Sequence, residues 1–122
     1  MNVPSNLKYT QNDEWLLEEN GQVKIGITDY AQHELGDIVF VDLPSVGDSF
    51  NAGDDFAVVE SVKAAAEIYT QVTGKIVAVN EALADQPDLL NQDAFGNYIA
   101  IIEGTIDGDV MDAADYAAKI AK

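Results

Sequence analysis

Apolar and polar residues alternate along much of this chain with the two-residue period of half-buried β-strands. In residues 22–27 the aliphatic side chains occupy alternate positions, at Val23, Ile25 and Ile27. Asn20-Gly21 precedes this segment, and both residues tolerate the positive φ angles of a tight two-residue turn. The pattern therefore predicts a first β-hairpin made of residues 14–19 and 22–27.

Three stretches break the alternation and predict short helices. Residues 28–35 offer Thr28 or Asp29 as the N-cap and stop at a glycine. Residues 81–90 favour a helical turn or two interrupted by a proline. Asp109 is a candidate N-cap for an amphipathic helix at the C-terminus. After the second stretch, the apolar run 98–102 predicts the final strand.

The segment 36–42 resembles the segment 74–80 position by position. Two explanations stay open: an internal symmetry of two half-folds, or the frequent use of valine and isoleucine in β-rich sequences. Turn signals around residues 44–47, 51–53 and 73–74 separate the short strands. Together these features predict a mainly β fold of the barrel or sandwich type.

The charge of the chain is strongly one-sided. Six lysines, no arginine and 22 acidic residues give a formal net charge of -16, with an apolar fraction of 48%. Such a surface opposes binding to nucleic acid or anionic membranes and favours basic partner surfaces. The length of 122 residues predicts one domain, residues 1–122.

The sequence contains none of the common catalytic or metal-binding motifs considered below. There is no cysteine, no Ser-His-Asp order, no phosphate-binding glycine loop and no zinc spacing. His33 is the single histidine, which favours a solvated side chain and predicts no metal site. No apolar run approaches a membrane span, and the N-terminus shows neither a signal-peptide core nor an arginine-rich transit pattern. We expect a non-catalytic bacterial protein of the cytoplasm.

The run Glu60-Ser61-Val62-Lys63-Ala64 is the candidate functional stretch. β-prone residues lie on both sides, at 56–59 and 68–72, so Lys63 is expected at a bend between two strands. Helix propensity predicts a helix here instead, because Glu, Lys and three alanines in a row favour helix. By residue type alone, an ordinary surface lysine is the commoner explanation.

The surroundings of this stretch carry a resemblance to a known family. The matching segments are residues 25–32, 35–41, 43–44, 46–48, 58–64 and 74–83. The chain resembles the glycine cleavage system H-proteins over nearly its whole length. The resemblance implies a barrel-sandwich hybrid like that of lipoyl domains, with a few short helices including one at the C-terminus. It also implies lipoic acid bound covalently to Lys63. The lipoylating enzyme would recognise the residues around that lysine: Glu60, Ser61, Val62, Ala64 and Glu67.

Function follows from the same resemblance. An H-protein is a monomeric carrier that takes an aminomethyl group from the glycine decarboxylase, the P-protein, to the aminomethyltransferase, the T-protein. Dihydrolipoamide dehydrogenase, the L-protein, then reoxidises the lipoyl group. Two alternatives stay open: a lipoyl-relay protein that donates lipoyl groups to other carriers, and an unmodified acidic interaction domain.

The family pattern also suggests a pocket for the loaded arm, lined by carboxylates at Glu14, Glu34 and Glu67. Three positions depart from that pattern. Asp13 stands where the family has histidine, and Phe95 and Tyr98 replace the tyrosine and tryptophan that flank a glycine near the last strand. These departures predict different packing around the C-terminal strand.

Overall fold

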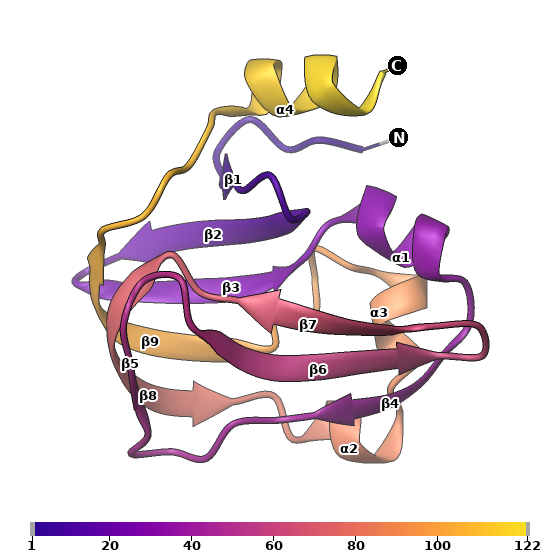
Figure 1. Cartoon of the computed structure of the whole chain (residues 1–122), viewed down its shortest axis with the longest axis horizontal. Helices are drawn as coiled ribbons and strands as arrows, with labels where there is room; N and C mark the ends of the chain where they lie inside the picture. Colours follow the sequence, from indigo (N-terminus) through magenta and orange to yellow (C-terminus); the bar gives the residue numbers. More distant parts are fainter. Residues whose placement is uncertain (1, 122) are drawn as a thin grey trace.

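Two antiparallel β-sheets and four short helices make up residues 2–121, the part of the chain that the computed structural model describes (Figure 1). The larger sheet has the order β1 (Lys8–Tyr9), β2 (Glu14–Glu19), β3 (Gln22–Ile27), β9 (Ala100–Ile106), β8 (Val72–Val79), β5 (Ser49–Phe50). The smaller sheet has the order β4 (Ile38–Asp42), β6 (Asp55–Ser61), β7 (Ala65–Tyr69). The helices are α1 (Asp29–Leu35), α2 (Ala82–Asp85), α3 (Leu89–Gln92) and α4 (Ala113–Ile120). The mainly β prediction is confirmed.

None of these helices, within residues 2–121, has the length and apolar composition that a membrane span requires.

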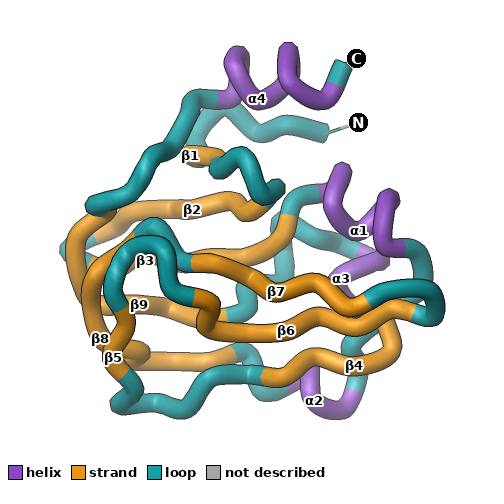
Figure 2. The backbone as a smooth tube through the Cα atoms, in the orientation of Figure 1, coloured by secondary structure: helices purple, strands orange, loops and turns teal. Residues whose placement is uncertain are grey.

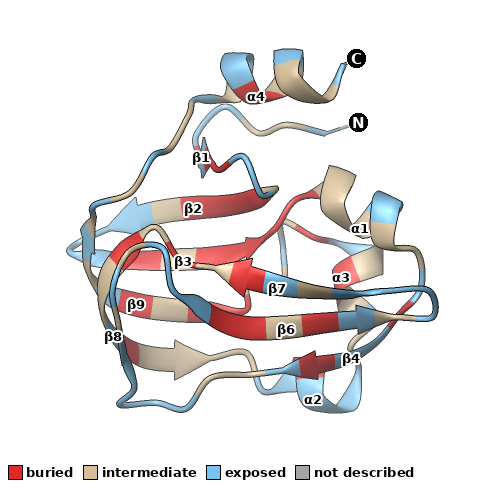
Figure 3. Ribbon diagram, viewed as in Figure 1, coloured by how far each residue is buried: buried red, intermediate tan, exposed pale blue. Residues whose placement is uncertain are grey.

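The first hairpin forms as the alternation predicts. β2 pairs with β3, and the connecting Asn20 and Gly21 have φ angles of 54° and 78°. The alternate aliphatic residues of β3 are completely buried (Figure 3). They belong to one apolar cluster that includes Val59 of the smaller sheet and Ile76 of the larger. The core is thus the apolar layer that holds the two sheets together.

The repeated segments contribute one strand to each sheet, β4 to the smaller and β8 to the larger. Each strand has an irregularity in its pairing at the same place in the repeat. The shift lies between Ile38 and Phe40 in β4, and between Ile76 and Ala78 in β8. A β-bulge is a specific structural feature, so its recurrence at equivalent positions favours internal symmetry over chance.

The helix α1 is capped at both ends as the sequence predicts. The Thr28 hydroxyl accepts a hydrogen bond from the backbone N–H of Ala31 at 3.2 Å, and Gly36 ends the helix with φ 80°. Of the two candidate caps, Thr28 is the one used. The proline between α2 and α3 separates them, as expected.

Two predictions for the C-terminal part are wrong. The last strand begins at Ala100 and runs to Ile106, because its pairing with β8 continues as far as Val72. The N-cap of α4 is Asp112, whose carboxylate accepts from the N–H of Asp115 at 2.9 Å, and not Asp109. Tyr9 and Met111 exchange two backbone hydrogen bonds, of 2.8 and 2.7 Å, and this bridge keeps the chain extended until the helix starts.

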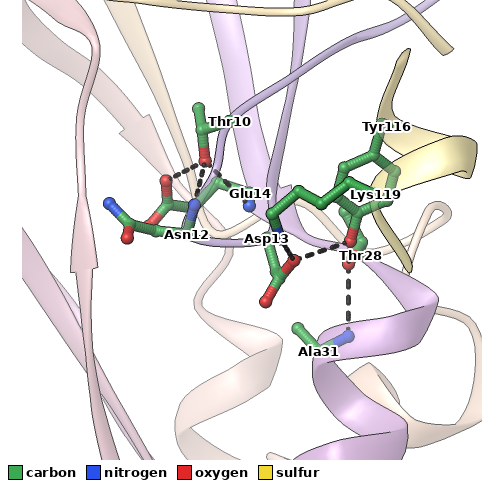
Figure 4. Close-up of polar contacts among 8 residues, drawn as sticks. All are labelled: Thr10, Asn12, Asp13, Glu14, Thr28, Ala31, Tyr116 and Lys119. Carbon is green, nitrogen blue, oxygen red and sulfur yellow. Dashed lines mark hydrogen bonds and ion pairs between the residues drawn. The ribbon is translucent and has the colours of Figure 1, made fainter. Parts of the chain in front are cut away.

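Tyr116 attaches α4 to the rest of the fold (Figure 4). Its ring stacks on Tyr9 with 4.6 Å between centroids. Its hydroxyl lies 3.0 Å from a carboxylate oxygen of Asp13 and 2.6 Å from the Thr28 hydroxyl. A carboxylate only accepts, so Tyr116 donates to Asp13 and accepts from Thr28. Lys119 pairs with the same Asp13 oxygen at 3.0 Å.

Replacing the Tyr116 hydroxyl should test this attachment. Tyr116→Phe keeps the stacking on Tyr9 but removes both hydroxyl contacts, so we expect the free energy of unfolding to fall by about 2 kcal/mol. Urea denaturation measures the change. Tyr98→Phe, at a half-buried tyrosine elsewhere, is the control and should change stability by less than about 0.5 kcal/mol. Equal stabilities of the two variants would contradict the role given to Asp13 and Thr28.

Candidate functional site

The predicted lysine lies at the tip of the hairpin formed by β6 and β7 (Figure 2). β6 ends at Ser61 and β7 begins at Ala65, so Lys63 occupies the turn between them. Val62, Lys63 and Ala64 are all exposed, and Figure 3 shows the tip as an exposed projection. The prediction of a bend between two strands is confirmed, and the helical alternative is wrong because pairing of both flanks in one sheet overrides local propensity.

Ser61 organises the backbone of this turn. Its side-chain oxygen accepts hydrogen bonds from the backbone N–H of Lys63 at 3.3 Å and of Ala64 at 3.1 Å. Its own backbone N–H donates to the carbonyl of Ala64 at 2.7 Å. A serine hydroxyl can replace the backbone acceptor of a tight turn in this way. The backbone at Lys63 is therefore held while its side chain extends from an exposed position.

A second contact fixes the tip against the body of the molecule. The N–H of Val62 donates to the carbonyl of Asp37, in the link between α1 and β4, at 3.0 Å. Asn91 of α3 supports that link, because its side chain donates to the carbonyl of Gly36 and accepts from the N–H of Ile38, each at 2.9 Å. The stem of Lys63 lies over the same link: a Cβ on Gly36 would be 3.9 Å from its Cε.

Two of the three carboxylates proposed for the arm pocket line one hollow. Glu34 and Glu67 belong to the wall of a depression of about 200 Å³, together with seven other residues. These are Asn12, Asp13, Ile27, Ala31, Leu35, Ala66 and Ile68. We call this depression the Glu34–Glu67 hollow. It lies between α1 and β7, the strand that follows the lysine turn.

Glu14 has a different position from the other two. It is completely buried, and it is not among the residues that line the Glu34–Glu67 hollow. One carboxylate oxygen accepts from the Thr10 hydroxyl at 2.5 Å, and the other accepts from the backbone N–H of Tyr69 at 3.0 Å. Because Glu14 begins β2 and Tyr69 ends β7, this carboxylate connects the two sheets.

Burial determines the protonation of Glu14. Desolvation raises the pKa of its carboxyl above the ordinary value of 4.5, and the nearby charge of Asp13 raises it further. The hydrogen bonds from Thr10 and Tyr69 lower it, but the net direction is upward. A buried carboxyl with two donors is thus a structural group whose charge state responds to pH.

The positions that depart from the family pattern have identifiable contacts. Asp13 takes φ 67° and holds α4 through Tyr116 and Lys119 (Figure 4). Phe95 lies against Trp15, with 6.3 Å between ring centroids. Together with Tyr98, these two aromatics line a depression of about 230 Å³ that also contains Lys24. Trp15 is buried, as expected for a residue of the core or its edge.

No cluster of three or more histidine, cysteine, aspartate or glutamate side chains suited to a metal ion occurs within residues 2–121. His33 is exposed, as predicted.

Sequence reasoning missed several groups near the site. The support from Asn91 and the attachment of α4 to Asp13 join residues far apart in the chain, and no local pattern marks such pairs. The exposure of Val39 and Phe40 was not foreseen, because a short apolar run does not show which of its residues the pairing turns outward. The serine in the lysine turn was a visible signal, because serine is favoured in turns.

Comparison with known proteins decides the family. The sequence model of the family described as glycine cleavage H-protein matches residues 7–121. The chain belongs to the glycine cleavage H-protein family. A glycine cleavage system H protein of Shewanella loihica is 50% identical, over 98% of this chain and 96% of its own length. One from Cronobacter sakazakii is 52% identical, over 96% and 95%.

A solved structure confirms the fold of the family. The crystal structure of a glycine cleavage system H protein from Mycobacterium marinum superposes with a TM-score of 0.92 at 34% sequence identity. The match covers 96% of this chain and 98% of the other. The barrel-sandwich prediction is therefore confirmed. Relatives of this name support the role of lipoyl carrier in glycine cleavage.

Removing the Ser61 hydroxyl should loosen the lysine turn. In Ser61→Ala the N–H groups of Lys63 and Ala64 lose their acceptor, so their amide hydrogens should exchange with solvent several-fold faster. NMR-detected exchange of these two amides measures the effect. Ser61→Thr retains an acceptor oxygen and should restore the protection. Unchanged exchange in the alanine variant would contradict the role of Ser61.

The raised pKa of Glu14 predicts a pH dependence of stability. The native carboxyl keeps its proton to a higher pH than the unfolded one, which titrates near 4.5. The stability gained from this proton is complete below pH 4.5 and is lost as the pH rises through the raised pKa. Glu14→Gln has no such proton to lose. The unfolding free energy of wild type relative to this variant should therefore fall across that interval and level off above it.

Urea denaturation at a series of pH values gives this difference. Glu34→Gln, at an exposed carboxylate, is the control for the loss of one carboxylate. A difference between wild type and Glu14→Gln that stays constant with pH would contradict the assigned direction of the Glu14 pKa.

Proposed function

We propose that residues 1–122 form a single, monomeric carrier domain whose lipoyl group is bound as an amide to Lys63. The observation that carries this proposal is the exposed lysine on an ordered hairpin tip, in a chain of the H-protein family. Small neighbours, Ala64 and Ala65, leave the amine accessible to a modifying enzyme. On this proposal Glu60, Ser61, Val62, Ala64 and Glu67 are the residues through which that enzyme recognises the turn.

The residues present fit the prosthetic group. Amide formation needs a primary amine that can lose a proton before it attacks an activated acyl carbon, and lysine supplies one on a flexible four-carbon stem. When bound, a lipoyl group supplies a disulfide that accepts electrons and a carbon fragment, chemistry that this cysteine-free chain lacks. The turn holds the attachment point, and its exposure lets the arm reach several partners.

The chain then acts as a non-catalytic subunit with several enzyme partners. We propose the glycine decarboxylase (P-protein), the aminomethyltransferase (T-protein), the dihydrolipoamide dehydrogenase (L-protein) and the lipoylating enzyme. Tethering raises the effective concentration of the carried group at each partner without tight binding. The net charge of -16 favours partners with basic surfaces. The bacterial relatives support a location in the bacterial cytoplasm.

The Glu34–Glu67 hollow is the proposed resting place of the loaded arm. A protonated amine carried on the arm is stabilised by nearby carboxylates, and Glu34 and Glu67 both line this depression. On this proposal Glu14 does not contact the arm but ties β2 to β7, the strand that supplies Glu67 to the wall of the hollow.

Lys63→Arg tests the attachment site. Arginine keeps the charge and the approximate size, so the fold should survive, but its guanidinium does not form the lipoyl amide. Mass spectrometry of intact protein produced with lipoate should show the lipoyl mass on wild type and its complete loss in Lys63→Arg. Lys75→Arg, at an exposed lysine within β8, is the matched control and should carry the full modification.

A wild-type protein without added mass would favour an unmodified interaction domain. Full modification of Lys63→Arg would place the lipoyl group on another residue. Either result would overturn the proposal.

A further inference from the structure

Two consecutive apolar side chains of β4 are directed to solvent. Val39 is 55% exposed and Phe40 is 50% exposed, whereas Ile38 and Val41 on either side are buried. The pairing explains this pattern: Ile38 lies opposite Ser61 and Phe40 lies opposite Glu60, so Val39 is an extra residue in the ladder. A bulge of this kind resets the alternation of side chains and turns both residues outward.

The repeated half of the molecule shows that the bulge itself belongs to the fold. At the equivalent place in β8 the corresponding residues are Val77 and Ala78, and both are half-buried. In β4, which belongs to the half that bears Lys63, the residue equivalent to Ala78 is Phe40, and its side chain is exposed to water. Folding therefore accounts for the bulge but not for the large apolar side chains on it. Exposed apolar groups that the core does not explain are typical of binding surfaces.

The lysine turn lies next to the start of β4, because Ile38 is paired with Ser61. Val62, next to Lys63, is 71% exposed, and its N–H is bonded to Asp37, the residue before β4. We call Val39, Phe40 and Val62 the bulge patch. Three exposed carboxylates are near it in the chain or in the pairing: Asp37 precedes β4, Asp42 ends it, and Glu60 lies directly opposite Phe40.

The surroundings of β4 indicate how a partner would bind. β4 is an edge strand of the smaller sheet, but α2 packs against it and the bulge interrupts its regular pairing (Figure 1). Addition of a partner strand is therefore disfavoured. Recognition through side chains fits better: apolar contacts at the centre and basic groups facing the carboxylates at the rim.

We propose that the bulge patch is the docking surface for the enzyme that acylates Lys63, and that this enzyme presents an apolar pocket rimmed by lysine or arginine. This inference rests on the proposed lipoylation of Lys63. Geometry favours this occupant over the other partners. The acylating enzyme must bring its active site to the Lys63 amine. That amine is only the length of one lysine side chain from the backbone of the turn, so the enzyme covers the residues beside the turn. Enzymes that act on the far end of the completed arm need not cover the residues beside the turn.

The rate of acylation tests the patch directly. A purified lipoate–protein ligase, supplied with lipoate and MgATP, is mixed with each unmodified variant, and the gain of lipoyl mass is followed over time. Val39→Ser/Phe40→Ser should lower kcat/KM by about tenfold or more, as expected when central apolar contacts of an interface are lost. Val46→Ser is the matched control. Val46 is 63% exposed but lies beyond the opposite end of β4, and its rate should stay within about twofold of wild type.

Competition separates docking from chemistry. Lys63→Arg retains the bulge patch and should inhibit acylation of wild type, and adding Val46→Ser should preserve this inhibition. Adding Val39→Ser/Phe40→Ser should abolish it, while circular dichroism and the urea midpoint report that the fold is intact. Wild-type rates in the patch variant, or undiminished inhibition by its Lys63→Arg form, would overturn the inference while leaving lipoylation standing. Failure of wild type to gain lipoyl mass would instead overturn the proposed function.

Discussion

A backbone hydrogen bond from the N–H of Val62 to the carbonyl of Asp37 holds the lysine turn against the link between α1 and β4. The tip of a hairpin is the part of a sheet that opens most easily, because few backbone hydrogen bonds hold it. Here the link between α1 and β4 supplies the missing contact, and Asn91 of α3 holds that link in place. Two distant elements therefore fix a turn that has little core of its own.

The backbone of the turn is thus held in place, whereas the side chain of Lys63 is free to move. Ser61 satisfies the N–H groups of the turn, so the backbone at Lys63 is defined, while the side chain is exposed. A carrier needs both properties, since each partner must find the same attachment point and the arm must still move between partners. Buried Glu14 connects the sheet that bears the turn with the larger sheet, through the N–H of Tyr69 at the end of β7 that is farther from the turn.

Much of this arrangement could be predicted from the sequence. Local signals were sufficient for the first hairpin, the Thr28 cap and the bend at Lys63, because each depends on residues close together in the chain. The late start of α4 could not be predicted, because it depends on a bridge between Tyr9 and Met111. Burial of Glu14 was also invisible, since its partner Tyr69 is distant in sequence. The bulge in β4 was hidden for a related reason: a run of apolar residues does not show which of them the pairing turns outward.

Carriage of a glycine-derived group is the central claim, and release of carbon dioxide from carboxyl-labelled glycine tests it most directly. Glycine decarboxylase is incubated with glycine and with this chain in its lipoylated form, its unmodified form or as the Lys63→Arg variant. We expect the lipoylated chain to support release of up to about one carbon dioxide per lipoyl group, because nothing in the mixture unloads or reoxidises the arm. The unmodified chain and the Lys63→Arg variant should support none. Equal release with the Lys63→Arg variant would contradict the account, as would a lipoylated wild type that supports no release.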